Sequence, residues 1–295
     1  MRAGLRGVLL AVVAVLVLSV SATTASAAST LRTSKPAWFT TTFKKQVNKS
    51  GSKGKAKPSA DGPGATDVCP GIDPSSPTPA TTVVSAGTCE VFPYGCTANF
   101  IYSNGSQYFI GTAGHCVDKV GQAVYMQVNT PGVGASIANV GTVSKFVNGG
   151  VGNDYSVIAI APGFTVDPKL PQGGPQGIYT DCGPTAVLHY GHGYGVAVAQ
   201  GKLEGGLATN WYDDGYGWTG AGAPGDSGSA VVTANGLQAA GDFTHLIVDT
   251  GGYLGSDLAG TRITKILAGT GLRLVNADGS TTPTASTSCG AQPKN

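Results

Sequence analysis

The sequence predicts an all-β fold, and three observations lead to that class. The chain of 295 residues includes 46 glycines and 17 prolines, and each glycine inside a helix costs about 1 kcal/mol relative to alanine. Hydrophobic residues make up 41% of the chain, which is enough to fill a core. Short β-type runs alternate with turn signals. Coiled coils and long helical bundles are therefore excluded, and the length allows one or two domains.

Five runs in the central part of the chain are rich in β-branched and aromatic residues, which favour strands. They lie at 108–110, 124–128, 155–160, 186–188 and 230–232. Asn104-Gly105 and Asn235-Gly236 lie between such runs and predict hairpin turns. One amphipathic helix is expected near residues 263–267.

The first 27 residues have the pattern of a secretory signal peptide. Arg2 and Arg6 precede an apolar run over residues 8–18, and the small residues Ala-Ser-Ala follow at 25–27. A membrane anchor is the alternative, but the run is shorter than the roughly 20 apolar residues that a spanning helix needs. We expect cleavage near Ala27, a secreted extracellular protein, and no membrane association after cleavage.

Residues 28–82 are rich in Lys, Ser, Thr, Pro and Gly, and we interpret them as a basic low-complexity leader or pro-segment. No acidic residue precedes Asp61. From residue 61 onward the chain has 8 basic and 16 acidic residues, which is a net charge of −8. Nucleic-acid binding needs a basic surface to neutralise phosphates, so no nucleic-acid partner is expected.

Six cysteines are present, at positions 69, 89, 96, 116, 182 and 289. Outside the cell an even number of cysteines is expected to form disulfides. No two of them have Cys-x-x-Cys spacing, so a zinc ribbon or a redox motif has no support. Spacing alone does not choose among the possible pairings.

Three short motifs carry residues for nucleophilic catalysis, in the order His, Asp, Ser. They are Gly-Thr-Ala-Gly-His-Cys at 111–116, Gly-Asn-Asp-Tyr at 152–155 and Ala-Pro-Gly-Asp-Ser-Gly-Ser at 223–229. Acyl transfer needs a nucleophile, a base and a carboxylate that orients the base. It also needs amide donors for the developing oxyanion, and Gly225 and Gly228 allow the tight turn that supplies them. Each residue alone has a structural explanation, but their joint occurrence favours a catalytic site.

These motifs resemble those of the chymotrypsin/trypsin family of serine proteases, and Thr-Ala-Gly-His-Cys is similar to its secreted bacterial branch. The resemblance covers about residues 96 to 265. It implies that Ser227 is the nucleophile, His115 the general base and Asp154 the orienting carboxylate. It also implies an oxyanion hole formed by the amides of Gly225 and Ser227.

The fold implied by the resemblance is two antiparallel six-stranded β-barrels. Residues 83–170 would form the first barrel, with the histidine and the aspartate. Residues 171–270 would form the second barrel, with the serine and a short C-terminal helix, and 271–295 would be a tail. The implied function is a secreted serine endopeptidase that acts as a monomer on protein or peptide substrates, with no cofactor and no metal.

The resemblance also implies a disulfide between Cys96 and Cys116 that braces the histidine loop. Three pairings then stay open for the other four cysteines, Cys69, Cys89, Cys182 and Cys289. Within 241–246, Thr244 is expected to supply a hydroxyl that contacts the catalytic carboxylate. Residues 259–265 resemble the family's final strand and the start of its C-terminal helix.

The primary substrate pocket is assigned by the same resemblance to Ala221, Thr244, His245, Leu246 and Gly260. Ala221, at the floor, provides no carboxylate for a buried Lys or Arg side chain, so cleavage after uncharged, apolar or aromatic residues is expected. The alternative is a preference for Glu, because a protonated His245 would attract a carboxylate. Strand alternation should point Asp242 away from this pocket.

Some features depart from the family or leave another function open. No Ile-Val-Gly-Gly sequence precedes residue 96, so Asp226 needs a partner other than a new N-terminal amine, or is solvated. His189, His192 and His245 are expected to be structural or to line the pocket rather than to bind metal. An α/β-hydrolase is disfavoured because Ser227 lacks the Gly-x-Ser-x-Gly pattern. The alternative from another class is a catalytically inactive, protease-like secreted binding module.

Overall fold

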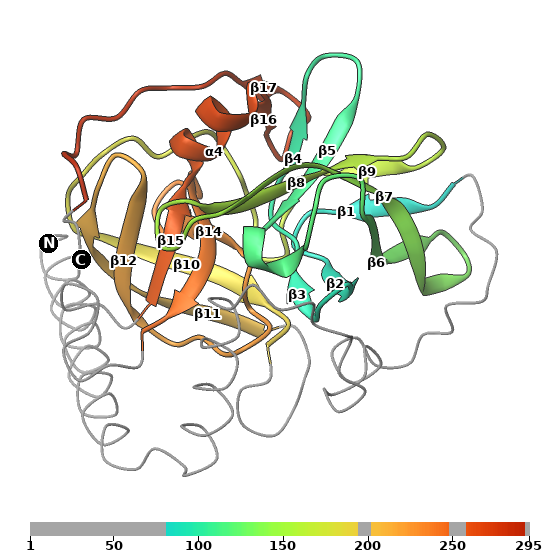
Figure 1. Cartoon of the computed structure of the whole chain (residues 1–295), viewed down its shortest axis with the longest axis horizontal. Helices are drawn as coiled ribbons and strands as arrows, with labels where there is room; N and C mark the ends of the chain where they lie inside the picture. The colour runs from blue at the N-terminus through green and yellow to red at the C-terminus, as the bar shows by residue number, and fades with distance from the viewer. Residues whose placement is uncertain (1–80, 194–201, 248–257, 293–295) are drawn as a thin grey trace, which may run out of the picture. The chain divides into compact units, whose positions relative to one another are not determined.

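Strands dominate the computed structural model, which describes residues 81–193, 202–247 and 258–292 (Figure 1). The described residues all belong to one unit, Ser59–Asn295. The predicted signal peptide, nearly all of the predicted leader and Cys69 lie outside the described residues.

Eleven strands form the first sheet. In sheet order they are β17 (Thr281–Thr282), β16 (Arg273–Val275), β4 (Ile101–Ser103), β5 (Tyr108–Thr112), β8 (Asp154–Ile160), β7 (Gly134–Asn148), β6 (Ala123–Thr130), β1 (Val83–Ser85) and β9 (Thr165–Asp167). The other two are β2 (Cys89–Phe92), which pairs with β6, and β3 (Cys96–Thr97), which pairs with β2. The pairs in this sheet are antiparallel except β1 with β9.

Six further strands close into a barrel, as the sequence predicted for the second half of the chain. Their order is β10 (Thr185–Gly191), β11 (Lys202–Trp211), β12 (Gly215–Gly220), β15 (Leu258–Arg262), β14 (Ala239–Leu246) and β13 (Ala230–Thr233). Antiparallel pairing of β13 with β10 closes the ring. The all-β class is thereby confirmed, and each of the five predicted runs lies inside a strand.

The predicted helix is α4 (Ile263–Thr270), which follows β15 directly. It ends at Gly271, whose φ of 72° lies in the left-handed region and whose N–H donates to the carbonyl of Leu267 at 2.8 Å. Ile263, Ile266 and Leu267 are buried in the core of the first sheet. Glycine at the C-terminus and apolar residues on one face therefore account for the helix and its position.

The core of the barrel contains a row of packed aromatic rings. Trp211 stacks on Tyr216 and Tyr216 on Trp218, with ring centroids 5.0 and 5.4 Å apart, and Trp218 meets Phe243 edge-on at 5.2 Å. The guanidinium of Arg262 lies 5.0 Å from the centre of the Trp211 ring. Large side chains fill this interior, so the barrel is a rigid support for the loops at its ends.

The C-terminal residues connect the two sheets. Residues 271–295, expected as a tail, contribute β16 and β17, and Leu274 pairs with Tyr102 at the edge of the first sheet. Beyond them, Cys289 forms a disulfide with Cys182, which precedes the barrel. The chain end therefore joins both halves.

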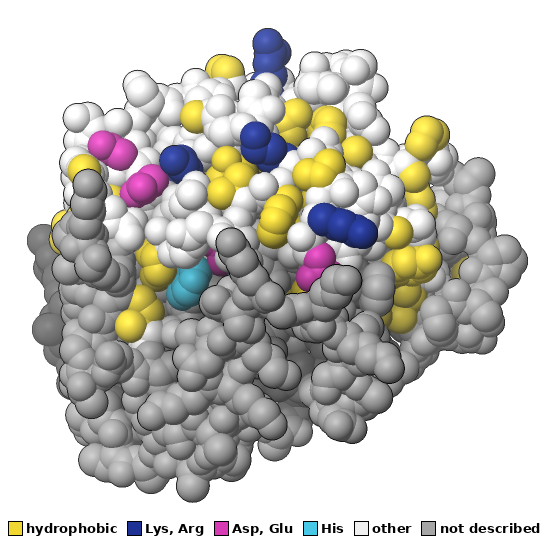
Figure 2. All heavy atoms as spheres, viewed as in Figure 1, with side chains coloured by type: hydrophobic (Ala, Val, Ile, Leu, Met, Phe, Trp, Pro, Cys, Tyr) yellow, Lys and Arg dark blue, Asp and Glu magenta, His cyan; other side chains and the backbone are white. Residues whose placement is uncertain are grey.

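The surface drawn in Figure 2 carries isolated Lys, Arg, Asp and Glu side chains among hydrophobic and uncharged ones. No continuous basic strip lies on the described part of this face. Among the residues that the structure describes, no helix is long and apolar enough to cross a membrane.

Candidate active site

His115 lies in the short 3-10 helix η1 (Gly114–Cys116), which follows β5. The close fit of this turn requires glycine at 114, because a Cβ there would lie 1.8 Å from the carbonyl oxygen of Val147. The carboxylate of Asp154 is also near, at 2.8 Å from that Cβ position. The sequence Gly-His therefore brings the histidine backbone close to β7 and β8, where a larger residue would not fit.

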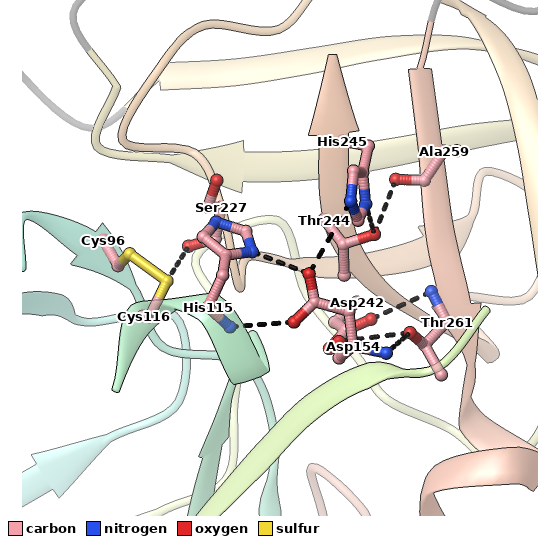
Figure 3. A network of polar contacts seen from close by, with 10 residues as sticks. All are labelled: Cys96, His115, Cys116, Asp154, Ser227, Asp242, Thr244, His245, Ala259 and Thr261. Carbon is pink, nitrogen blue, oxygen red and sulfur yellow. Dashed lines mark hydrogen bonds and ion pairs between the residues drawn. A yellow bond between two sulfur atoms is a disulfide. The ribbon is translucent and has the colours of Figure 1, made fainter. Parts of the chain in front are cut away.

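Asp154 begins β8 and is fully buried. Its Oδ1 accepts the main-chain N–H of His115 at 2.8 Å, and its Oδ2 lies 2.7 Å from Nδ1 of the same residue. Its own main chain is bonded to Thr261 of β15, whose hydroxyl accepts the N–H and donates to the carbonyl, both at 3.1 Å. The predicted histidine and aspartate are thus together, and the barrel contributes to placing the aspartate (Figure 3).

Ser227 lies in the turn before β13, between Gly225 and Gly228, whose φ values are 100° and 90°. Its carbonyl accepts the N–H of Thr97 at 2.9 Å and lies 3.7 Å from Sγ of Cys116. Gly228 approaches the backbone just before η1, since a Cβ there would be 2.8 Å from the nitrogen of Ala113. The serine turn of the barrel is therefore attached to the histidine loop of the first sheet.

The two predicted oxyanion donors are the N–H groups of Gly225 and Ser227. Among the described residues, neither donates a hydrogen bond to a protein acceptor. The hydroxyl of Thr97 donates to the carbonyl of Gly225 at 2.9 Å, and the N–H of Gly228 donates to Phe243 at 2.6 Å. These bonds hold the turn on both sides.

Asp226, which precedes Ser227, is fully buried. Its carboxylate accepts N–H groups from Ala223 and Gly193, both at 2.7 Å, and these are its partners in place of an N-terminal amine. Burial raises the pKa of Asp226 to about 7, and the negative charge of Glu204 adds to the rise.

His189, Glu204 and Asp226 bring three side chains with metal-ligand atoms within 4.8 Å of one another. His189 and Glu204 are direct cross-strand partners on β10 and β11. The Glu204 carboxylate forms an ion pair with Lys202, and Nε2 of His189 lies 3.0 Å from the carbonyl oxygen of Ala221. These protein partners use ligand atoms that a metal ion would need.

A second group, Cys96, His115 and Cys116, also has the composition of a metal site. Its two sulfur atoms are bonded to each other, with an S–S distance of 2.03 Å. A disulfide sulfur is not a thiolate, so this group offers a metal only the histidine ring. The pairing is the one that the resemblance implied.

The observed Cys182–Cys289 disulfide selects one of the three pairings that stayed open. Cys89 is also disulfide-bonded, and Cys69 lies outside the described residues. None of the described cysteines is free.

The expectation for Thr244 was wrong. Its hydroxyl donates to the carbonyl of Ala259 at 3.2 Å and has no hydrogen bond with Asp154. The side chain near the carboxylate is instead His245, with Nε2 at 3.9 Å from Oδ2 of Asp154. Burial lowers the pKa of His245; the charge of Asp154 opposes this shift, and the charge of His115 adds to it.

Gly260, which was assigned to the pocket, and Gly222, which is next to the expected floor, both have close neighbours. The face of Gly260 on which a side chain would stand lies against Tyr216 and the main chain of Asp242, inside the barrel. Gly222, next to Ala221, approaches Phe243 and Leu258 at 3.1 Å from its Cβ position. These two buried apolar side chains, rather than Gly260, lie beside the expected floor.

Asp242 is fully buried. Its Oδ1 accepts the N–H of Thr261 at 3.0 Å. Burial raises the pKa of Asp242 well above its usual range, and the charge of Asp154 adds to the rise.

Sequence reasoning missed the contributions of Thr97 and Thr261. Thr97 binds both the serine turn and the N–H of His192, and Thr261 binds the aspartate. Both act through contacts between residues far apart in the sequence, and neither stands in a motif that a single sequence would single out.

Comparison with known proteins gives matches among solved structures. Protease A of Thermobifida fusca is 20% identical, with a TM-score of 0.48, over 65% of this chain and 98% of the protease. A glutamic-acid-specific serine protease, described as using a histidine triad in substrate binding, is 18% identical, with a TM-score of 0.43, over 64% and 98% of the two chains. A homologue of alpha-lytic protease, N4, is 17% identical, with a TM-score of 0.43 and the same coverage.

No family model matches the chain, and no curated protein matches it. The structural neighbours are bacterial serine proteases, the class that the three sequence motifs resemble.

Proposed function

We propose that this protein is a secreted serine endopeptidase that hydrolyses peptide bonds through Ser227, His115 and Asp154. The observation that carries the proposal is the double contact of Asp154 with His115, at 2.8 Å to the main-chain nitrogen and 2.7 Å to Nδ1. With the proton on Nδ1 directed to the carboxylate, Nε2 has a free electron pair and serves as the base.

The first half of the reaction forms an acyl-enzyme. The Oγ of Ser227 bonds to the substrate carbonyl carbon while its proton moves to Nε2 of His115, and the carbonyl electron pair moves to the oxygen. The N–H groups of Gly225 and Ser227 stabilise that oxyanion. The C–N bond then breaks, and the proton on His115 passes to the leaving amine. Water repeats these steps to release the acid and restore the serine.

The described pocket residues favour uncharged side chains before the cleaved bond. Phe243 and Leu258 adjoin Gly222, and neither they nor Ala221 provides a charge that would pair with Lys or Arg. A preference for Glu through His245 has less support, because Nε2 of this residue faces Asp154. Cleavage after apolar or aromatic residues is the preference that we propose.

Two features support an extracellular location. The first 27 residues have a signal-peptide pattern, and two disulfides join described cysteines. We propose that the protein acts there as a monomer on proteins or peptides.

A fluorophosphonate probe tests the function directly, because it labels an activated serine. The secreted, processed protein should be labelled at Ser227, and label and peptide hydrolysis should both be lost in Ser227→Ala and His115→Ala. Ser229→Ala, in the same turn, is the matched control and should keep the label. A folded, processed protein that takes no label would favour the inactive binding module.

A further inference from the structure

A β-bulge determines where the side chain of His245 points. On β14 and β15, Asp242 pairs with Thr261 and Phe243 with Gly260, but the next partner of β15, Ala259, pairs with His245. Thr244 is therefore the extra residue of a bulge, and bulges re-aim the side chains around them. Phe243 enters the barrel and is 1% exposed, whereas the side chain of His245 is 34% exposed and lies beside Asp154.

The hydroxyl of Thr244 contacts both the carbonyl oxygen of Ala259 and Nδ1 of His245. Its single hydrogen is directed to the carbonyl of Ala259 at 3.2 Å, and a carbonyl can only accept. The same hydroxyl lies 2.8 Å from Nδ1 of His245, and with its hydrogen on the carbonyl of Ala259 it accepts a hydrogen bond from that nitrogen. The neutral ring therefore holds its proton on Nδ1 and has a free electron pair on Nε2.

That electron pair faces a carboxylate oxygen. Nε2 of His245 lies 3.9 Å from Oδ2 of Asp154, the same oxygen that is 2.7 Å from Nδ1 of His115 (Figure 3). An electron pair on Nε2 cannot form a hydrogen bond with the lone pairs of Oδ2. The neutral ring of His245 therefore does not interfere with the contact between His115 and Oδ2. A second proton on His245 would create an N–H donor directed at Oδ2 and a positive charge beside the proposed base.

We propose that His245 is a positioning residue that holds Asp154 available to His115 when neutral and competes for Oδ2 when protonated. The inference rests on the proposed function, because it assigns a second proton-dependent control to the same site. Protonated His245 would weaken the contact that orients His115 and would repel the imidazolium that forms in the transition state.

The charged groups around His245 support this assignment. Among the described residues, β8 presents Asp154 and η1 presents His115, whose ring centroid is 6.0 Å from that of His245. β15 contributes the uncharged Ala259 to this contact, and Asp242 on β14 itself accepts the N–H of Thr261. Burial lowers the pKa of His245, so the ring is neutral near pH 7 and gains its proton in acid.

The pH dependence of kcat/KM distinguishes two protons from one. If a single proton inactivates the site, kcat/KM falls about tenfold for each pH unit on the acid side of the profile. If His245 also gains a proton, kcat/KM falls toward about 100-fold for each pH unit on the acid side of the profile. The two apparent pKa values of that profile then belong to the pair of histidines. His245→Asn and His245→Phe should both give the shallower limb.

Thr244→Val separates the tautomer from the charge. Valine has a similar shape but no hydroxyl, so the neutral ring of His245 can place its proton on Nε2, which lies 3.9 Å from Oδ2 of Asp154, at pH 7. We expect a several-fold lower kcat with an unchanged KM in Thr244→Val, and recovery in the double variant Thr244→Val/His245→Phe. Equal kcat values for Thr244→Val and its parent would overturn the role of the hydroxyl.

A spectroscopic measurement keeps the inference testable without activity. In Ser227→Ala protein with ¹⁵N-labelled histidine, NMR should show the neutral ring of His245 protonated on Nδ1, and His115 shifting as His245 titrates. An Nε2–H tautomer, or a His115 signal that ignores His245, would overturn the inference. If instead the parent enzyme takes no fluorophosphonate and this NMR result is obtained, the proposed function fails and the proton-dependent contact stands.

Discussion

Thr261 and Asp154 bind each other's strands across the two sheets: the Thr261 hydroxyl accepts the Asp154 N–H and donates to the Asp154 carbonyl, both at 3.1 Å. One side chain of the barrel thereby satisfies both main-chain groups of the residue that orients His115. The relative position of the serine and the histidine depends on contacts of this kind.

Thr261→Val should weaken both stability and activity. Two buried main-chain groups lose their partner, which costs about 1–3 kcal/mol each at most, and Asp154 moves from its position under His115. Urea unfolding and peptide hydrolysis measure the two effects. The matched control is Thr264→Val, because the Thr264 hydroxyl is buried and has no hydrogen-bond partner among the described residues. Equal losses in both variants would contradict a specific role for Thr261.

Gly114→Ala should be destabilising, because the added methyl group would meet the carbonyl oxygen of Val147 at 1.8 Å. Moving the backbone to relieve this contact costs about 1–3 kcal/mol, and η1 carries His115 with it, so hydrolysis should fall further than stability does. Gly183→Ala is the control, since nothing lies within 4 Å of its Cβ position. Thermal unfolding and kcat/KM for both variants check this prediction.

Asp154→Asn should reduce hydrolysis by about 10⁴-fold, because an amide favours the wrong tautomer of His115. The amide oxygen can still accept the N–H of His115, so the fold should be retained. Kinetics with an ester substrate and circular dichroism of the same sample test the two statements. Retention of activity within tenfold of the parent would exclude Asp154 as the orienting group.

Glu90 predicts a pH dependence of stability. This side chain is fully buried on β2, and burial raises its pKa from 4.5 to about 8. A raised pKa means that the folded state binds the proton more tightly than the unfolded state does. The proton on Glu90 therefore adds to the free energy of unfolding at pH 4, and this contribution is lost as the pH rises to about 8. The total loss is on the order of 5 kcal/mol at most.

Glu90→Gln removes the ionisable group and should flatten this part of the curve. Urea unfolding at intervals from pH 4 to pH 9 measures the free energy of unfolding for both proteins. As the pH rises, the free energy of unfolding of the variant should increase relative to that of the parent. Two parallel curves of this free energy against pH would show that Glu90 does not cause the loss.

Local patterns predicted the strands and turns because alternating apolar residues and Asn-Gly pairs act within a few residues. The same holds for His115, Asp154 and Ser227, each of which stands in a short motif whose joint order is informative. The wrong expectation concerned Thr244, and its cause is a bulge that depends on the pairing of β14 with β15. Alternation predicts side-chain direction only while the register is regular.

Long-range contacts were not predictable from one sequence. The hydroxyl of Thr97 reaches the carbonyl of Gly225, and the carboxylate of Asp226 reaches the N–H of Gly193. The sequence separation of these partners follows no rule that would predict the contact, because the residues meet only after the two sheets have packed. The choice of Cys182 as the partner of Cys289 has the same origin.

The pairing of Leu274 with Tyr102 has a consequence for the order in which the molecule is made. β4 gains β16 as a neighbour only after residues 273–275 have been synthesised, and domains fold from the N-terminus as the chain emerges. A chain interrupted before residue 273 would hold all three residues of the proposed triad, yet β4 would lack its neighbour and Cys182 its sulfur partner. The complete first sheet and the Cys182–Cys289 disulfide therefore form only with residues that are synthesised after all three residues of the proposed triad.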